Sequence, residues 1–120
     1  MGPVAVEMSA EEFGHEVDRA LDAVPEELAR LVRNCVVLVE EEPPPEEPNL
    51  FGLYEGIPLT ERDSWYGATL PDRILIFRGP LQRHCRDIEE LVDEIHITVV
   101  HEIAHHFGID DARLHQLGYG

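Results

Sequence analysis

Basic side chains are scarce in this sequence. Nine lysine and arginine residues stand against 25 aspartate and glutamate residues, and the formal net charge is −16. A surface of this sign repels phosphate groups, so nucleic acids and anionic membranes are excluded as favoured partners. Solubility explains most of the acidity, and a preference for basic peptides is the functional alternative.

Targeting and anchoring signals are missing as well. Residues 1–10 contain no basic stretch followed by an apolar run, so no signal peptide is predicted. Val6 occupies the position where N-myristoylation requires serine or threonine. No apolar run is long enough to span a membrane. We therefore expect a cytoplasmic protein.

Cysteine is limited to Cys35 and Cys85, which are far apart and form no C-x-x-C pair. We expect both thiols to be reduced and buried. No internal repeat is present, and 120 residues suit a single domain over residues 1–120. A domain of this size buries about two-thirds of its unfolded surface.

Two helices are predicted near the N-terminus. Ser9 and Glu12 match the capping-box pattern that opens a helix. Pro25 suits the first turn of a second helix. The apolar residues expected to face inward are Phe13, Val17, Ala20 and Leu21 in the first helix, and Leu28, Leu31 and Val32 in the second.

Three short segments are predicted as strands. Residues 35–39 form a β-branched run typical of a buried strand, and a brief strand is expected around Leu53 and Tyr54. The clearest strand is 74–77, which lies between Pro71-Asp72 and Gly79-Pro80.

A long helix is predicted from Ile88 to Phe107, because Asp87 and Glu90 form a second capping box and a 3.6-residue period follows. Shorter helices are expected over 80–85 and 111–117. The wide apolar arc of the long helix comprises Leu91, Val92, Ile95, Val99, Val100 and Ile103. We expect an α+β architecture in which a small sheet packs on helices and this helix is buried between them.

The segment from His101 to Asp111 reads H-E-x-x-H-x-x-G-x-x-D. Residues four apart share one helix face, so His101 and His105 can place both imidazoles around one zinc ion. Glu102 can reach the water that the metal activates and act as its general base. The pattern predicts a metal site.

A third ligand is expected after the helix ends at Gly108. Asp111 has the right spacing, and a carboxylate oxygen is an accepted zinc ligand. His115, one turn later, is the alternative. Asp110 is better explained as a helix cap, and His106 points away from the metal face, where it is structural or supports a ligand.

The remaining candidate residues have weaker patterns. His15, His84 and His96 have no partners at metal-binding spacing, and we interpret them as surface or core residues. Trp65 and Tyr66 can bind a substrate side chain, although aromatic pairs in loops more often pack.

The stretch from Leu50 through Leu117 resembles the small bacterial zincin-like metallopeptidases, or mini-zincins, of the Asp-zincin kind. The resemblance is carried by LYEGIPLTER at 53–62, LPDRI at 70–74, RGPL at 78–81 and HEIAHHFGIDD at 101–111. It implies a compact zincin domain with zinc as cofactor. It further implies His101, His105 and Asp111 as ligands, and Glu102 as catalytic base.

One departure from the larger metzincins concerns the floor of the site. Those enzymes have a methionine turn after the third ligand, but Met1 and Met8 lie at the opposite end of this chain. Tyr119 is placed to form that floor, and its hydroxyl can stabilise an oxyanion; surface packing is its alternative role. Only nine residues follow Asp111, which removes most of the primed-side cleft and argues against ordinary endopeptidase activity.

The leading hypothesis is a zinc hydrolase of peptide or amide bonds, with an extended peptide paired to strand 74–77 or near Leu53. The second is a zincin-like scaffold or regulatory module with little turnover. The third is a homodimeric interaction protein with an acidic docking loop. That loop, residues 40–49, is rich in proline and is expected to be solvated, extended and unable to pair or pack. A flap over the metal is its alternative role.

Overall fold

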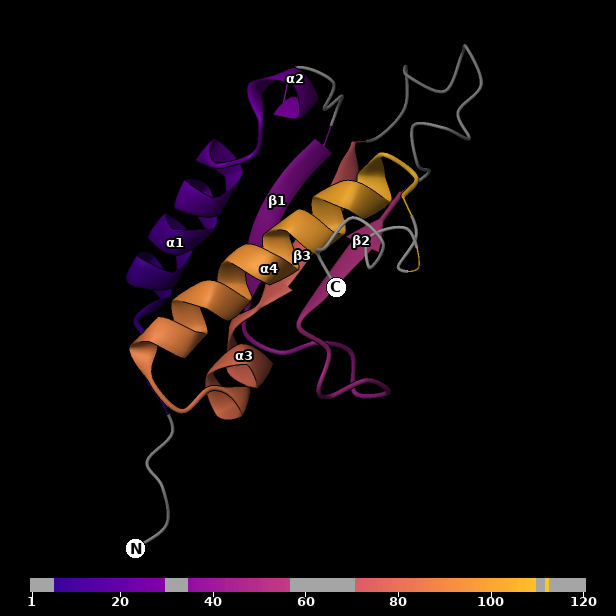
Figure 1. The fold of residues 1–120 in the computed structure, drawn as a ribbon. Coiled ribbons are helices and arrows are strands. Elements are labelled where there is room, and N and C mark those ends of the chain that lie inside the picture. Colours follow the sequence, from indigo (N-terminus) through magenta and orange to yellow (C-terminus); the bar gives the residue numbers. More distant parts are fainter. Residues whose placement is uncertain (1–5, 30–34, 57–70, 110–111, 113–120) are drawn as a thin grey trace, which may run out of the picture.

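The computed structural model describes residues 6–29, 35–56, 71–109 and 112. Two helices, three consecutive strands and two further helices form an α+β domain, which confirms the expected class (Figure 1). The elements in chain order are α1 (Ala10–Asp22), α2 (Glu26–Ala29), β1 (Cys35–Glu40), β2 (Gly52–Glu55), β3 (Asp72–Phe77), α3 (Arg78–His84) and α4 (Ile88–His106).

The three strands form one mixed sheet in the order β1-β3-β2. Central strand β3 runs parallel to β1, with Cys35 opposite Asp72, and antiparallel to β2, with Gly52 opposite Ile76. Both edges of β3 are therefore occupied. The expectation that a peptide pairs with strand 74–77 is wrong, because that strand has no open edge.

Helices α1 and α4 cover one face of this sheet, and α4 runs across β3 and β2 (Figure 1). The apolar arc predicted for α4 packs inward, although Val92 and Val100 are only partly buried. Ile97 on the same helix is 50% exposed, so α4 is not enclosed on every side. The principal core residues are Phe13, Val17, Ala20, Ile74, Ile76, Leu81, Leu91, Ile95, Val99 and Ile103.

The two long helices begin where the sequence predicts. The Ser9 hydroxyl accepts a hydrogen bond from the Glu12 N–H at 3.1 Å. The Asp87 carboxylate accepts one from the Glu90 N–H at 2.8 Å. Each bond satisfies a backbone donor that the first helical turn leaves unpaired. The residue at which α4 begins determines which of its later residues face the sheet.

Strand β1 differs from the buried strand that its composition predicts. Its residues alternate between half-buried and exposed, and Val36 and Leu38 are each 41% exposed. The reason is that β1 packs on the helices through one face only, and successive side chains of a strand point to opposite faces.

Cys35 and Cys85 form no disulfide with each other. Cys85 is buried, as expected, whereas Cys35 is only half-buried. Burial, followed by the negative charges of Glu90, Glu94 and Asp87, raises the pKa of the Cys85 thiol to about 11. Cys85 therefore stays protonated at neutral pH and is a weak nucleophile.

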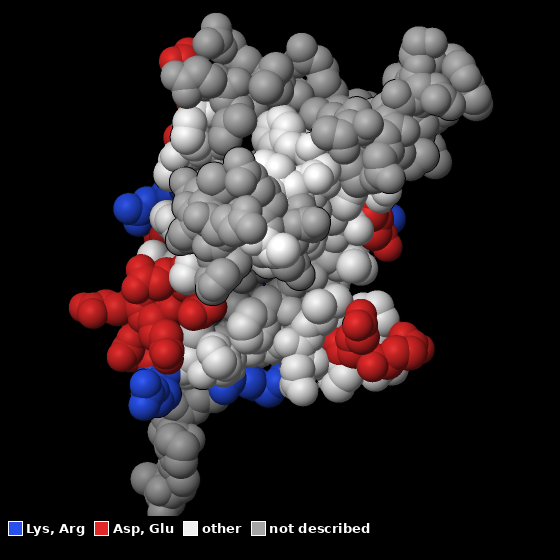
Figure 2. Space-filling view, turned by 45° about the vertical axis from the view of Figure 1, so that its right-hand side comes forward, with Lys and Arg blue, Asp and Glu red and all other residues white. Residues whose placement is uncertain are grey.

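The charged surface is divided into separate areas. Acidic side chains gather over the beginning of α4 and again on the acidic loop, with uncharged surface between them (Figure 2). Among the described residues, no helix is long and apolar enough to cross a membrane.

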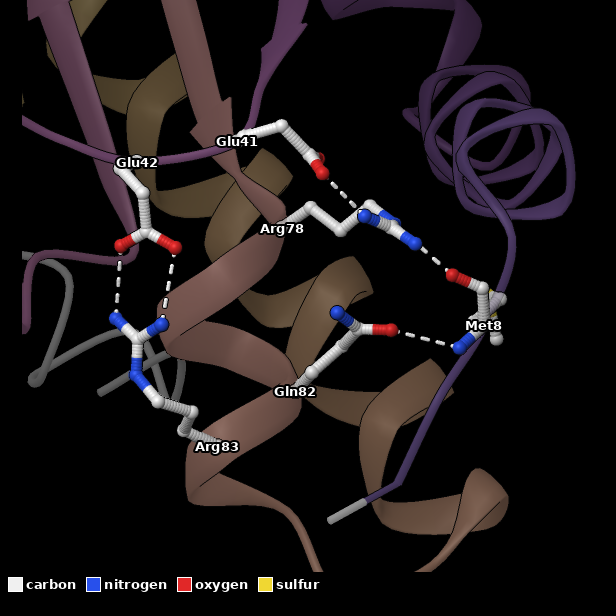
Figure 3. A network of polar contacts seen from close by, with 6 residues as sticks. All are labelled: Met8, Glu41, Glu42, Arg78, Gln82 and Arg83. Carbon is white, nitrogen blue, oxygen red and sulfur yellow. Dashed lines mark hydrogen bonds and ion pairs between the residues drawn. The ribbon is translucent and has the colours of Figure 1, made fainter.

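The beginning of the acidic loop is tied to α3 (Figure 3). Glu42 accepts two hydrogen bonds of 2.9 Å from the Arg83 guanidinium, which lowers the pKa of the Glu42 carboxyl. Glu41 pairs with Arg78, and its carbonyl accepts from the Gly79 N–H at 2.8 Å. The expectation that this loop cannot pair or pack is wrong, because two arginines of α3 neutralise its first carboxylates.

A second contact holds the loop close to α3. A Cβ atom at Gly79 would lie 2.7 Å from the Glu41 carbonyl oxygen, so a side chain at that position would force the backbone to shift. The Arg83 guanidinium also donates to the Pro48 carbonyl at 3.4 Å, and Pro43 is buried. Arg83 therefore contacts both ends of the loop and holds the start of the segment 49–52 close to α3.

Candidate metal centre

The last two turns of α4 bring three of the predicted site residues together. Potential ligand atoms of His101, Glu102 and His105 all lie within 4.8 Å of one another. The two imidazole rings are 4.8 Å apart and inclined by 76°. His105 Nδ1–H donates to Glu102 Oε1 at 3.2 Å. The spacing of one helical turn thus produces the shared face that the sequence predicts.

The three side chains differ in exposure. Glu102 is 6% exposed, whereas His101 and His105 are half-buried. A pocket of about 340 Å³ opens beside His101 and Glu102. One wall is residues 49–52, where the acidic loop enters β2, and the other is α4 at Glu94, Ile97 and Thr98. The carboxylate is therefore shielded from bulk water but borders a cavity.

Gly52 allows β2 to pass close to the carboxylate. A Cβ atom at this position would lie 2.8 Å from Thr98 Cγ2 and 3.0 Å from Glu102 Cγ. The glycine therefore brings the strand against the helix and limits the positions open to the Glu102 side chain. Sequence reasoning missed this contact, because nothing local indicates that residues 52 and 102 meet.

A buried polar cluster joins α4 to the sheet behind the histidines. His106 Nδ1–H donates to Asp72 Oδ2 at 3.0 Å, and both side chains are 0% exposed. The Tyr54 hydroxyl donates to the same carboxylate oxygen. The cluster fixes the last turn of α4, which also carries His105. His106 thus points away from His101 and His105, as predicted.

Asp72 and Tyr54 were not singled out as site residues from the sequence. The cluster joins residues of β2, β3 and α4, and His106 is 34 residues from Asp72 along the chain. Gly56 has φ of 156°, and a Cβ atom there would lie 2.4 Å from Asp72 Cγ. Only glycine fits this approach.

The donor set fits a zinc ion. Imidazole nitrogen and carboxylate oxygen are both common zinc ligands, and ligand atoms about 2.1 Å from a tetrahedral zinc lie roughly 3.4 Å from one another. The imidazoles of His101 and His105, which belong to a cluster of potential ligand atoms within 4.8 Å of one another, suit two of these positions, and the Glu102 carboxylate lies beside them.

Several predicted residues lie outside the described ranges. They are Asp110, Asp111, His115, Tyr119, Trp65 and Tyr66, together with the expected helix over 111–117 and the inner residues Leu31 and Val32. The third ligand and the role of Tyr119 therefore remain predictions.

The other histidines lie away from this cluster. His15 is exposed, and His84 is exposed with its ring 5.1 Å from that of Phe51. His96 Nε2 lies 3.5 Å from Glu16 Oε1, at the contact of α1 and α4. Within the described residues, the sole group of three potential metal ligands is the one around His101.

A helix bearing H-E-x-x-H against a mixed sheet defines a zincin-like scaffold. The model of the zincin-like metallopeptidase family matches residues 32–120, and the chain belongs to this family. Its scaffold is of the metallopeptidase type, and the family normally binds zinc.

Two further comparisons bear on the relatives of the chain. No curated protein matches it. A solved structure, a conserved hypothetical protein from Thermo thermophilus, is 24% identical and has a TM-score of 0.62. The match covers 83% of this chain and 94% of that one. At this identity it shows the shared fold.

Proposed function

We propose that the protein is a zinc-dependent metallopeptidase that hydrolyses peptide or amide bonds. The observation that carries the proposal is the group of His101, Glu102 and His105, whose ligand atoms lie within 4.8 Å beside an open pocket. Membership of a metallopeptidase-type family supports the same chemistry.

Each residue has a separate task in this proposal. The imidazoles of His101 and His105 bind the metal as neutral ligands, and Asp111 is the third ligand implied by the family motif. When bound, zinc polarises a scissile carbonyl and brings the pKa of a water molecule to about 7. Glu102 accepts the proton of that water and returns it to the leaving amine.

The packing of Glu102 suits this task. Contact with Gly52 holds its side chain against β2, and the bond to His105 keeps it beside the metal-binding face. A general base held in place needs little reorganisation before proton transfer. Tyr119 is proposed to stabilise the oxyanion.

The substrate is proposed to lie along β2. Among the described residues, β2 is the edge strand of the sheet next to α4, with β3 on one side of it. The pocket begins at Gly52, the first residue of this strand. An extended peptide added at this edge passes beside Glu102, which favours the Leu53 region for pairing.

The alternative is a zinc-binding zincin-like scaffold or regulatory module with little or no proteolytic turnover. We expect zinc-loaded protein to cleave members of a random peptide library, with activity lost on chelation and restored by stoichiometric zinc. Mass spectrometry of the products measures this directly. Zinc-loaded protein that cleaves nothing in the library would instead favour the non-proteolytic module.

A further inference from the structure

The pocket beside the histidines extends well beyond them along α4. Glu94 and His101 both line it, and they are separated by seven residues, or almost two helical turns. They share one face of α4, about 10.5 Å apart along its axis at a rise of 1.5 Å per residue. One continuous cavity thus connects the candidate metal centre to a carboxylate two turns away.

The middle of this cavity is mainly apolar. Phe51 and Leu50 contribute to the wall formed by the loop and β2, and Ile97 contributes to the helical wall. Ile97 is 50% exposed, so a large apolar side chain faces open space. A ligand that fills this part of the pocket buries apolar surface.

Glu94 gives the far end of the pocket its charge. The side chain is half-buried, and within the described residues no hydrogen bond or ion pair neutralises it. The acidic side chains gathered over the beginning of α4 add to the negative potential there (Figure 2). The nearby surface therefore favours a cation.

We propose that this cavity binds the side chain of an arginine or lysine residue in an extended peptide substrate. The aliphatic part of that side chain lies against Phe51 and Ile97, and its cationic group pairs with Glu94. The inference rests on the proposed function and names its substrate class as peptides with a basic residue near the scissile bond.

The distance between Glu94 and the metal-binding histidines suits a basic substrate residue close to the scissile bond. An extended chain advances about 3.3 Å per residue, so Glu94 lies roughly three residues from the metal-binding histidines. Basic side chains can bury an apolar stem while the charged end reaches a polar partner. A charge-assisted bond to a half-buried carboxylate is stronger than one at a fully exposed site.

Binding can be separated from turnover with the Glu102→Gln protein loaded with zinc. The probes are fluorescein-labelled decapeptides of alanine and serine, each with one arginine or one glutamate at successive positions. We expect fluorescence anisotropy to show about tenfold tighter binding for arginine than for glutamate at one or two positions. Glu94→Gln should remove this preference, and Glu94→Lys should reverse it.

Asp93→Lys is the matched control, because Asp93 is an exposed neighbour on α4 and the substitution changes the net charge equally. It should leave the arginine preference in place. Equal affinities for both peptide series, or the same response to Asp93→Lys as to Glu94→Lys, would overturn the basic subsite.

The outcomes also distinguish the subsite from the proposed function. Cleavage by the wild-type protein with no preference for arginine overturns the subsite alone. An arginine preference without cleavage of any peptide supports the subsite on a non-proteolytic scaffold. Failure of every peptide to bind would contradict both.

Discussion

Replacing Asp72 with alanine is expected to lower the free energy of unfolding by about 2–6 kcal/mol, because each of two buried donors left without an acceptor costs about 1–3 kcal/mol. The substitution leaves the His106 N–H and the Tyr54 hydroxyl without their common acceptor, inside a region where both Asp72 and His106 are fully buried. A domain of this size has a total stability of roughly 5–15 kcal/mol, so the loss is large.

Urea unfolding followed by circular dichroism measures this change. Asp93→Ala is the control, because Asp93 is exposed on α4 and its removal should change stability by no more than about 0.5 kcal/mol. A loss below about 1 kcal/mol for Asp72→Ala would show that the buried cluster does not hold α4 to the sheet.

Replacing Glu102 with glutamine is expected to leave zinc binding intact and to reduce kcat by about 10²–10⁴-fold, the usual contribution of a general base. Glutamine has the same shape and retains the contact with Gly52, but its amide cannot accept a proton from water at neutral pH. Zinc content, thermal melting and peptide hydrolysis should be measured on the same preparation.

Glu89→Gln provides the comparison for this experiment, because Glu89 is an exposed residue in the first turn of the same helix. It should retain wild-type hydrolysis. Equal activity of the Glu102→Gln protein would exclude Glu102 as the base, and loss of zinc from that protein would mean that Glu102 is a ligand.

Local features of the sequence predicted the helices and part of the site. Ser9 and Asp87 begin α1 and α4 as their capping patterns indicate, because a cap and its partner are three residues apart. The His101–His105 contact follows from helical geometry alone. These predictions depend on interactions between residues within one or two turns of the same helix.

Contacts between distant segments were not predictable in the same way. Arg83 and Glu42 are 41 residues apart, and nothing in the acidic run indicates which arginine neutralises it. The pairing of β3 on both sides likewise depends on the fold, so a peptide was wrongly expected to pair with it. The contact of Gly52 with Glu102 was not predictable for the same reason, because the two residues are distant in the sequence.

The most direct test of the metal centre is the zinc content of purified wild-type protein beside His101→Ala, with His15→Ala as an exposed histidine control. Elemental analysis after dialysis should give about one zinc per chain for the wild type and His15→Ala, and almost none for His101→Ala. Equal zinc in all three proteins, or none in the wild type after loading, would contradict a metal held by these side chains.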